Sequence, residues 1–500
     1  MSARLVITNL AIACALLLSG CASLTNSHSQ KQPMMNSYIQ GDLAGALAEA
    51  EKRVKKSAER DLIAWRLEAA RLSFATADYD RALDHFRATD DLIASFDERA
   101  IISLRDMSAE TTVAISNPTA MPYRGLCRDR VALSIYKSLS YLGQGNEEAF
   151  RAQLRRLRQD QKDILENYQK FLEADNKQLE EQYKKRQDVG DTVKNLTTAD
   201  NLATRPENQE FAAGWKTSKV LSPHGYGDFL NPAALFLSAL GNIRDENYDN
   251  ARIDIKSILD ARPTHPLFRQ YFTTLLKAAG RDIPAEFADA KPFDFPLDRD
   301  CVYVLVANGR SAALQQAAIH FPFAFALPYC VTYAPTFTSY VATAGGQAYD
   351  APVISDMDGI LGQEFTMRFP QTLRRALTGA MIKDTAFFAS LGFLGGRRNH
   401  PSRNSHLGEA LLRLGIVAAG AAYRHAMNVA DTRSWETLPK DYRLTQFPMP
   451  KDRKVTISLS GATSSSANLD IPPQAKSAII FVNAPSAQTI QIQIFPMTTK

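Results

Sequence analysis

Residues 63–93 have the sequence IAWRLEAARLSFATADYDRALDHFRATDDLI, and this stretch decides the fold of the first half of the chain. Small and apolar side chains recur at helical spacing on both sides of a short turn at residues 76–78: Leu67, Ala70 and Phe74 before it, Tyr79, Ala82 and Phe86 after it. A period of about 3.6 residues predicts two amphipathic helices. Each helix buries its apolar face against the other, so the unit is a helix–turn–helix pair.

Three further segments repeat this pattern, namely residues 38–54, 131–157 and 231–259. Residues 77–86 resemble the second half of a tetratricopeptide repeat (TPR), in which small and aromatic residues alternate so that paired helices interlock. The copies do not recur at the regular interval of about 34 residues, so we expect a TPR-like stack and not a regular array. Such stacks commonly grip a partner segment on their concave side. The alternative is a plain helical domain without a ligand.

We expect this TPR-like α-helical domain to cover residues 37–290, with a long charged helix near residues 147–190. In that helix apolar side chains are sparse but keep helical spacing. Five prolines between residues 263 and 296 mark a boundary near residue 290, and beyond it the period becomes strand-like. The predicted strands are residues 302–307, 314–319, 325–333, 455–458, 467–471, 478–482 and 489–495.

Residues 291–500 are therefore predicted to form a β-rich, sandwich-like domain. Asn308-Gly309 is a strong turn pair after its first strand. A helical insert is expected near residues 355–430, starting at a capping-box-like Ser355 and Asp358 and continuing as helices over residues 361–381 and 407–429. The predicted fold class is α+β, an all-α repeat domain followed by a β-rich domain with a helical insertion.

The first residues carry a targeting signal. Arg4 precedes a fourteen-residue, mostly apolar run that ends in Leu18-Ser19-Gly20-Cys21. A positive start, a short apolar stretch and small residues before a cleavage point are typical of a secretory signal, here residues 1–20. The LSGC sequence resembles the bacterial lipobox, which implies that Cys21 is lipidated. Residues 21–36 are expected to be the lipidated cysteine and a flexible tether. An ordinary signal with a chance cysteine is the alternative.

Lipid anchoring places the mature chain in an oxidising compartment. Ala22 follows the cysteine, which in similar lipoproteins of Gram-negative bacteria implies sorting to the outer membrane, so we expect a periplasm-facing location. Cys127, Cys301 and Cys330 then remain. Cys301 and Cys330 lie in two strand-like runs of one predicted domain, where they either form a disulfide or stay as buried thiols.

Composition and motifs argue against several function classes. The net charge of +5, from 58 basic and 53 acidic residues in 500, is too small for a nucleic-acid-binding surface. The sequence contains no nucleophile elbow, Walker loop, dinucleotide-binding fingerprint or zinc-protease helix. Its eight histidines, with His400 and His406 in a loop, have no partners at metal-ligand spacing. We therefore expect no catalytic residues, no metal and no cofactor.

Two features come nearest to a chemical site. The glycines near residue 395 and the following Arg397-Arg398 form a basic loop that could hold a phosphate, but no strand precedes it, and a helix-ending loop is the simpler interpretation. Asp356 and Asp358 look like paired carboxylates. They lie at a predicted helix start, where acids favour the helix dipole, so a structural role is preferred.

One stretch carries a family resemblance. Residues 430–439, Ala-Asp-Thr-Arg-Ser-Trp-Glu-Thr-Leu-Pro, together with Asn308-Gly309 and Asp356-Met357, resemble an uncharacterised family of bacterial TPR-like lipoproteins with an ADTRSW-type motif. Its members are often encoded beside lipoproteins similar to activators of penicillin-binding proteins, which implies a role in envelope assembly. Lys451-Asp452-Arg453 replaces a glycine-containing turn of the family, so partner identity does not carry over.

The residue types of the motif favour structure over catalysis. Asp431 and Arg433 bracket Thr432, while Ser434 precedes Trp435 in a segment leaving a helix. We expect Arg433 to pair with a carboxylate and Trp435 to be buried between helix and sheet. The sequence as a whole predicts a non-enzymatic outer-membrane lipoprotein whose repeats bind periplasmic or outer-membrane proteins. The alternative is an envelope hydrolase or glycan-binding protein that uses the second domain, with loops around Gly346 and Arg397.

Overall fold

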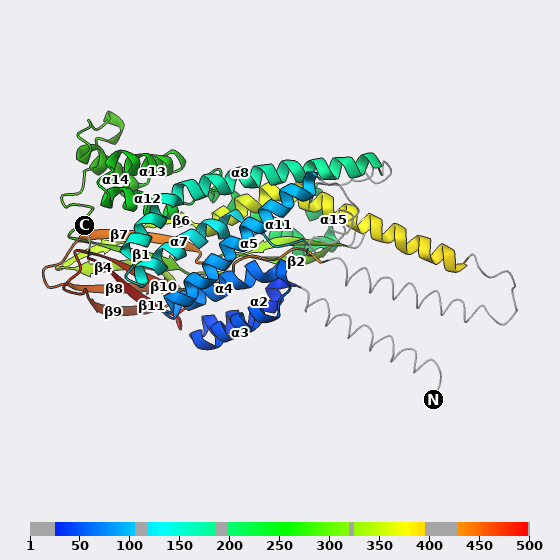
Figure 1. Cartoon of the computed structure of the whole chain (residues 1–500), viewed down its shortest axis with the longest axis horizontal. Helices are drawn as coiled ribbons and strands as arrows, with labels where there is room; N and C mark the ends of the chain where they lie inside the picture. Colours follow the sequence, from blue (N-terminus) through cyan, green and yellow to red (C-terminus); the bar gives the residue numbers. More distant parts are fainter. Residues whose placement is uncertain are drawn as a thin grey trace.

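The computed structural model describes residues 26–105, 119, 121–185, 198–319, 325–395 and 429–498, and within them helices cover one face of a β-sandwich (Figure 1). The signal segment, Cys21, most of the basic loop after Gly395 and the predicted helix 407–429 lie outside these residues. The helices before residue 290 are α2 (Ser27–Ile39), α3 (Leu43–Lys56), α4 (Leu62–Ala75), α5 (Tyr79–Arg105), α7 (Cys127–Gly143), α8 (Glu147–Lys185), α10 (Ala199–Ala203), α11 (Gln209–Leu221), α12 (Pro232–Arg244), α13 (Tyr248–Ala261) and α14 (Pro266–Ala278).

Each of the four predicted segments contains a turn between two helices, at α2–α3, α4–α5, α7–α8 and α12–α13, and the four share one type of turn; helix α2 itself was not predicted. In each turn a residue with positive φ is followed by an Asp or Asn that caps the next helix. The positive-φ residues are Gly41, Ala77, Gly145 and Glu246, and the caps are Asp42, Asp78, Asn146 and Asn247. The left-handed residue ends one helix, and the side-chain oxygen starts the next.

The predicted long charged helix is α8, which extends along the outside of the helical layer (Figure 1). The predicted tether, in contrast, is wrong from residue 26 onward, because α2 begins at Ser27 and is packed into the fold. Lys31, Met34, Met35 and Tyr38 are all at most 3% exposed. Met34, Met35 and Tyr38 belong to one hydrophobic cluster with residues of α3 and α4, and Lys31 donates to the Ser434 carbonyl. The polar composition of the segment hid this buried face.

The strands form two stacked sheets and a hairpin. The five-stranded sheet has the order β11-β10-β1-β7-β6, the four-stranded sheet the order β5-β4-β8-β9, and β2 pairs with β3. Their bounds are β1 Cys301–Asn308, β2 Ala313–Ile319, β3 Phe325–Val331, β4 Phe337–Ala344, β5 Gln347–Asp350, β6 Val353–Asp356, β7 Asp441–Pro448, β8 Lys454–Gly461, β9 Ser464–Asp470, β10 Ser477–Ala484 and β11 Gln491–Met497. The predicted α+β class, with its sandwich-like second part, is confirmed.

Strand β1 shows how the three layers are joined. Alternate residues point to opposite faces of a strand. Val302, Val304 and Val306 belong to the core between the two sheets, whereas Tyr303, Leu305 and Ala307 belong to the core shared with the helices. One hydrophobic core therefore extends across the predicted boundary near residue 290.

The first helix of each pair faces the five-stranded sheet. Phe74 of α4 meets Phe481 of β10 edge to face at 5.4 Å between ring centroids, and Tyr136 of α7 contacts the same ring at 6.1 Å. Phe236 of α12 lies 6.1 Å from Tyr303 of β1. The chain's own strands thus cover the side of the stack formed by α4, α7 and α12.

The helical insert starts later than expected. Residues 353–356 form β6, Ser355 belongs to this strand, and α15 (Met357–Gly395) is capped by Asp356, whose Oδ1 accepts from the Gly359 amide at 3.0 Å. Ser355 donates instead to Asn231 Oδ1 at 3.0 Å. The predicted helix 361–381 lies within α15.

Strands β4 and β5 were not predicted, because their Ser, Thr and Gln residues alternate without a strong apolar face.

Candidate functional site

The motif at residues 430–439 connects the region after α15 to β7 and is almost completely enclosed. Thr432, Ser434, Trp435 and Leu438 are at most 1% exposed, although the segment has neither helical nor strand hydrogen bonding. An irregular buried segment must satisfy its backbone groups with other partners. Helices α2, α4 and α7 supply these partners, so the motif is a junction, as the residue types predicted.

Arg433 connects the motif to neighbouring segments through ion pairs and hydrogen bonds. Its guanidinium pairs with Asp431 at 2.7 Å and with Asp61 at 2.9 Å, and it also donates to the Met121 carbonyl at 2.9 Å. Burial alone would raise the pKa of Asp431, but the neighbouring Arg433 charge lowers this pKa below its usual value. The predicted pairing of Arg433 with a carboxylate is thus observed, with a second carboxylate contributed by the start of α4.

Trp435 is the apolar centre of the junction. Its ring contacts Tyr136 of α7 at 5.8 Å and Phe86 of α5 at 6.3 Å, and its indole nitrogen donates to Thr437 Oγ1 at 3.0 Å. Its backbone amide donates to Asp129 Oδ2 at 3.0 Å. A buried tryptophan with its polar nitrogen satisfied is well suited to a structural role.

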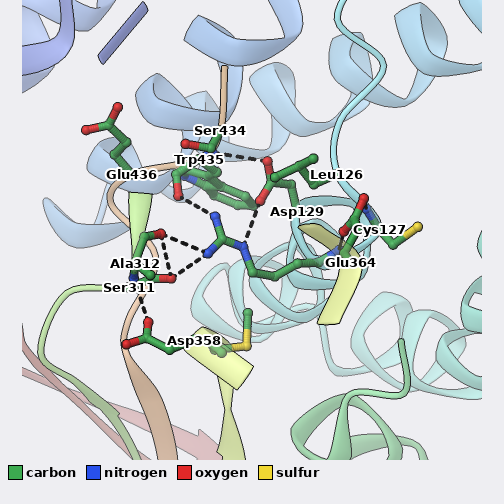
Figure 2. Close-up of polar contacts among 12 residues, drawn as sticks. Leu126, Cys127, Asp129, Ser311, Ala312, Asp358, Glu364, Ser434, Trp435 and Glu436 are labelled. Carbon is green, nitrogen blue, oxygen red and sulfur yellow. Dashed lines mark hydrogen bonds and ion pairs between the residues drawn. The ribbon is translucent and has the colours of Figure 1, made fainter. Parts of the chain in front are cut away.

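Arg128, which the sequence did not single out, joins three parts of the chain. Figure 2 shows its partners Asp129, Ser311, Ala312 and Trp435. Its guanidinium donates to Ser311 Oγ at 2.5 Å and to the Ala312 carbonyl at 3.1 Å, just before β2. It also donates to the Trp435 carbonyl at 3.3 Å and pairs with Asp129. The planar guanidinium has five donors, which allows one side chain to satisfy several carbonyls at once.

Glu68 of α4 holds the motif from the opposite side. Its carboxylate accepts from the Glu436 amide at 2.8 Å and from Thr437 Oγ1 at 2.7 Å, and it pairs with Lys31 of α2 at 2.7 Å. Lys31 also donates to the Ser434 carbonyl at 2.6 Å. Neither Lys31 nor Glu68 was predicted, because a lone charge in a polar or helical segment gives no sign of burial.

Asp358 and the two cysteines of the possible disulfide lie inside the fold. Asp358 accepts from the Ala312 amide at 2.5 Å and pairs with Lys440, so its carboxylate holds two segments of the fold together. The possible disulfide between Cys301 and Cys330 is absent, because both are free, buried thiols in separate hydrophobic clusters. Burial raises the pKa of each thiol to about 12.

A cavity of about 330 Å³ lies beside the junction. Its lining includes Leu126, Cys127, Glu364, Asp431 and Arg433, so it shares residues with the network around Arg128 and with the motif. Glu364 accepts from the Cys127 amide at 3.1 Å at the start of α7, and burial raises the pKa of Glu364. This cavity could not be predicted from the sequence, because its walls come from seven separate segments.

Other predicted positions are not brought together. Gly346 lies in the exposed β4–β5 hairpin, and Arg397, His400 and His406 fall outside the described residues. Among the residues that the structure describes, no group of three or more His, Cys, Asp or Glu side chains is placed to hold a metal ion. A search of the same residues for a helix both long and apolar enough to cross a membrane found none.

Comparison with known proteins gave no relative: no family model, no curated protein and no solved structure matches this chain.

Proposed function

We propose that the protein is an outer-membrane lipoprotein, anchored through Cys21 and facing the periplasm, that acts as a scaffold for proteins of envelope or surface-structure assembly. The lipobox-like sequence before Cys21 supports the anchor, and the helix pairs support the interaction role, because stacked helix pairs commonly present binding surfaces. The proposal assigns no catalytic step to the protein.

One observation carries the proposal, namely the short distance in sequence between Cys21 and a firmly held helix. Asn26, five residues after Cys21, caps α2 and accepts a hydrogen bond from Thr432 of the motif at 2.9 Å. Five residues span at most about 18 Å even when fully extended. A lipid on Cys21 would hold this end of the fold close to the membrane surface, as a scaffold of fixed orientation requires.

The partner would bind the outer surface of the helical layer. The inner side, where repeat proteins commonly take a partner segment, is filled by the chain's own sheet and motif. Helix α8 offers an alternative surface: Lys170 and Glu166 are 67% and 66% exposed, and Arg155 reaches Asp245 at 2.7 Å. Such a charged helix face favours selective, salt-dependent contacts.

Two measurements test the two halves of the proposal. Cys21→Ser should move the protein from the membrane fraction to the soluble periplasmic fraction, and retention in the membrane would contradict the anchor. A photo-crosslinking amino acid at Lys170 should capture a discrete envelope protein in intact cells. The same group at Phe74, which is buried, serves as the control; equal crosslinking at both positions, or none at Lys170 and at Glu166, would contradict the scaffold.

A further inference from the structure

The cavity beside the motif has a wall of aromatic and aliphatic side chains. These come from α5, α8 and α15 and include Phe96, Tyr168, Phe171, Leu361 and Phe365. The volume of about 330 Å³ lies within the range of about 300–1,000 Å³ that small-molecule sites occupy. The wall is suited to an apolar group the width of an acyl chain.

Arginines surround this apolar wall. Six arginines and two acids line the cavity: Arg99, Arg124, Arg130, Arg368, Arg375 and Arg433, against Glu364 and Asp431. Arg124 stacks on Phe171 at 4.3 Å, and Arg99 stacks on Phe96 at 4.7 Å. A stacked guanidinium keeps its N–H groups at the edge of the plane, where they can bind a carboxylate or phosphate.

Acids offset part of this charge: Arg99 pairs with Glu59 at 2.8 Å, and Arg368 pairs with Glu364 at 3.4 Å. Arg124 and Arg130 share one carboxylate, Asp97, at 2.6 Å and 2.7 Å. Burial lowers the pKa of Arg124, Asp97 acts to raise it, and the nearby charges of Arg130 and Arg368 lower it further. Burial also lowers the pKa of Arg375 to about 10. An anionic group in the cavity would offset the remaining positive charge.

We propose that this cavity binds an anionic amphiphile, with an acyl chain against the aromatic wall and a phosphate head on the arginines. A phosphate head fits this site because arginine can bind its oxygens with two parallel hydrogen bonds. The cavity therefore recognises an acidic phospholipid. The bilayer as the source of this lipid rests on the proposed anchor at Cys21. Binding of the lipid to the cavity does not depend on the anchor.

The position of the cavity agrees with a membrane source. Ala430 and Asp431 line it, and the next residue, Thr432, holds Asn26 at the start of α2. Helix α15, which forms one wall, continues through residues 385–395, a stretch of sequence without a charged residue. The end of the fold nearest to the proposed anchor is thus also the end that holds the cavity.

The test uses the full chain carrying Cys21→Ser, without a bilayer, and fluorescent lysophosphatidylglycerol below its micelle concentration. Arg375→Gln removes a charge that lines the cavity, and Arg374→Gln removes the adjacent, exposed charge of the same helix. We expect Arg375→Gln to raise Kd at least tenfold and Arg374→Gln to change it less than twofold. Lysophosphatidylcholine should bind at least tenfold more weakly than the anionic lipid.

A second pair of variants tests the apolar wall. Ala376→Trp places a large ring in the cavity from α15 and should raise Kd at least tenfold. If this variant fails to fold, Thr372→Phe, at another lining position, replaces it in the experiment and should have the same effect. Met367→Trp on the exposed face of the same helix, at 52% exposure, is the control and should leave binding unchanged. Equal effects of Arg375→Gln and Arg374→Gln, equal binding of both lipids, or unchanged binding in the filled variant would each overturn the proposal. Because no membrane is present, loss of the anchor would not alter these results.

Discussion

The Lys31 ammonium donates to the Glu68 carboxylate at 2.7 Å, and both side chains are 0% exposed. This pair connects the first helix of the described chain to the motif, because each member also bonds the backbone near Trp435. Removing one member of a buried pair commonly costs about 3–5 kcal/mol, since the other charge is left without compensation. The two members are nevertheless not equivalent.

Glu68→Ala should destabilise the fold more than Lys31→Met does. Glu68 accepts from two backbone amides and a hydroxyl in addition to Lys31, whereas its carboxylate keeps these three donors when Lys31 is replaced. Chemical unfolding followed by circular dichroism measures both. Lys52→Met is the control, because Lys52 pairs with Glu49 at 2.9 Å but is 56% exposed, and such surface pairs contribute about 0–1 kcal/mol. Equal losses in all three variants would contradict this assignment.

Trp435→Ala should lower the melting temperature sharply. The ring is 0% exposed and contacts aromatic rings of two helices, and truncation of a buried tryptophan costs about 3–5 kcal/mol. Trp435→Phe, which keeps most of the volume but loses the bond to Thr437, should lose less. Val220→Ala, at 59% exposure, is the neutral control. If Trp435→Ala left the melting temperature unchanged but abolished partner capture, the motif would have a role in partner recognition and not in stability.

Asp254 should make stability depend on pH. Burial raises the pKa of Asp254 to about 6, above the value of about 3.9 in an unfolded chain. The folded state therefore binds the proton more tightly, so this group stabilises below about pH 4 and loses that contribution as the pH rises through 6. The free energy of unfolding of the natural protein minus that of Asp254→Asn should fall by up to about 3 kcal/mol between pH 4 and pH 7. A flat difference would show that Asp254 has its ordinary pKa.

The shared turn offers a reciprocal pair of substitutions. Ala77 has φ +60° and Gly145 has φ +74° at the same place in two helix pairs. Left-handed backbone favours glycine, so Ala77→Gly should stabilise by about 0.5–1 kcal/mol and Gly145→Ala should destabilise by a similar amount. A β-carbon at Gly145 would meet no atom within 4 Å, so backbone strain alone would cause the loss. Changes of the same sign at both positions would contradict the common turn.

The three thiols should be free and protected. Cys127, Cys301 and Cys330 are all buried, so a thiol reagent should label none in the folded protein and all three after unfolding without reductant. Adding reductant should leave the melting temperature unchanged. A single labelled thiol after unfolding would instead reveal the disulfide between Cys301 and Cys330.

Local patterns predicted the local parts of the fold. Helical spacing located three helix pairs and the second helix of the fourth, and apolar runs located β1, β2, β3 and β8 to β11, because each pattern depends on neighbouring residues. Strands β4 to β6 were missed, since their faces are apolar only in part. Helix α2 was missed because its segment is polar in composition. Lys31 and Tyr38 contact residues some 400 positions away, while Met34 belongs to a hydrophobic cluster with residues of α3 and α4.

The junction could be predicted only in its residue types. Trp435 and Arg433 suggested a buried aromatic ring and an ion pair, and both are observed. Arg128 and Glu68 could not be found, because a charge on a helix is exposed unless something covers it. The cavity was also beyond reach, since its lining is assembled from segments as distant as Phe96 and Arg433.

The contacts of α2 also set the order in which the chain can reach its final state. Tyr38 bonds Asn483, and its carbonyl accepts from Thr489 at 2.6 Å. These two hydrogen bonds can form only after more than 400 further residues have been synthesised, although Met34, Met35 and Tyr38 also pack against the nearby helices α3 and α4. Contacts so distant in sequence form slowly and leave apolar surface open to aggregation meanwhile. The fold is thus completed only after β10 and the segment before β11 have been synthesised.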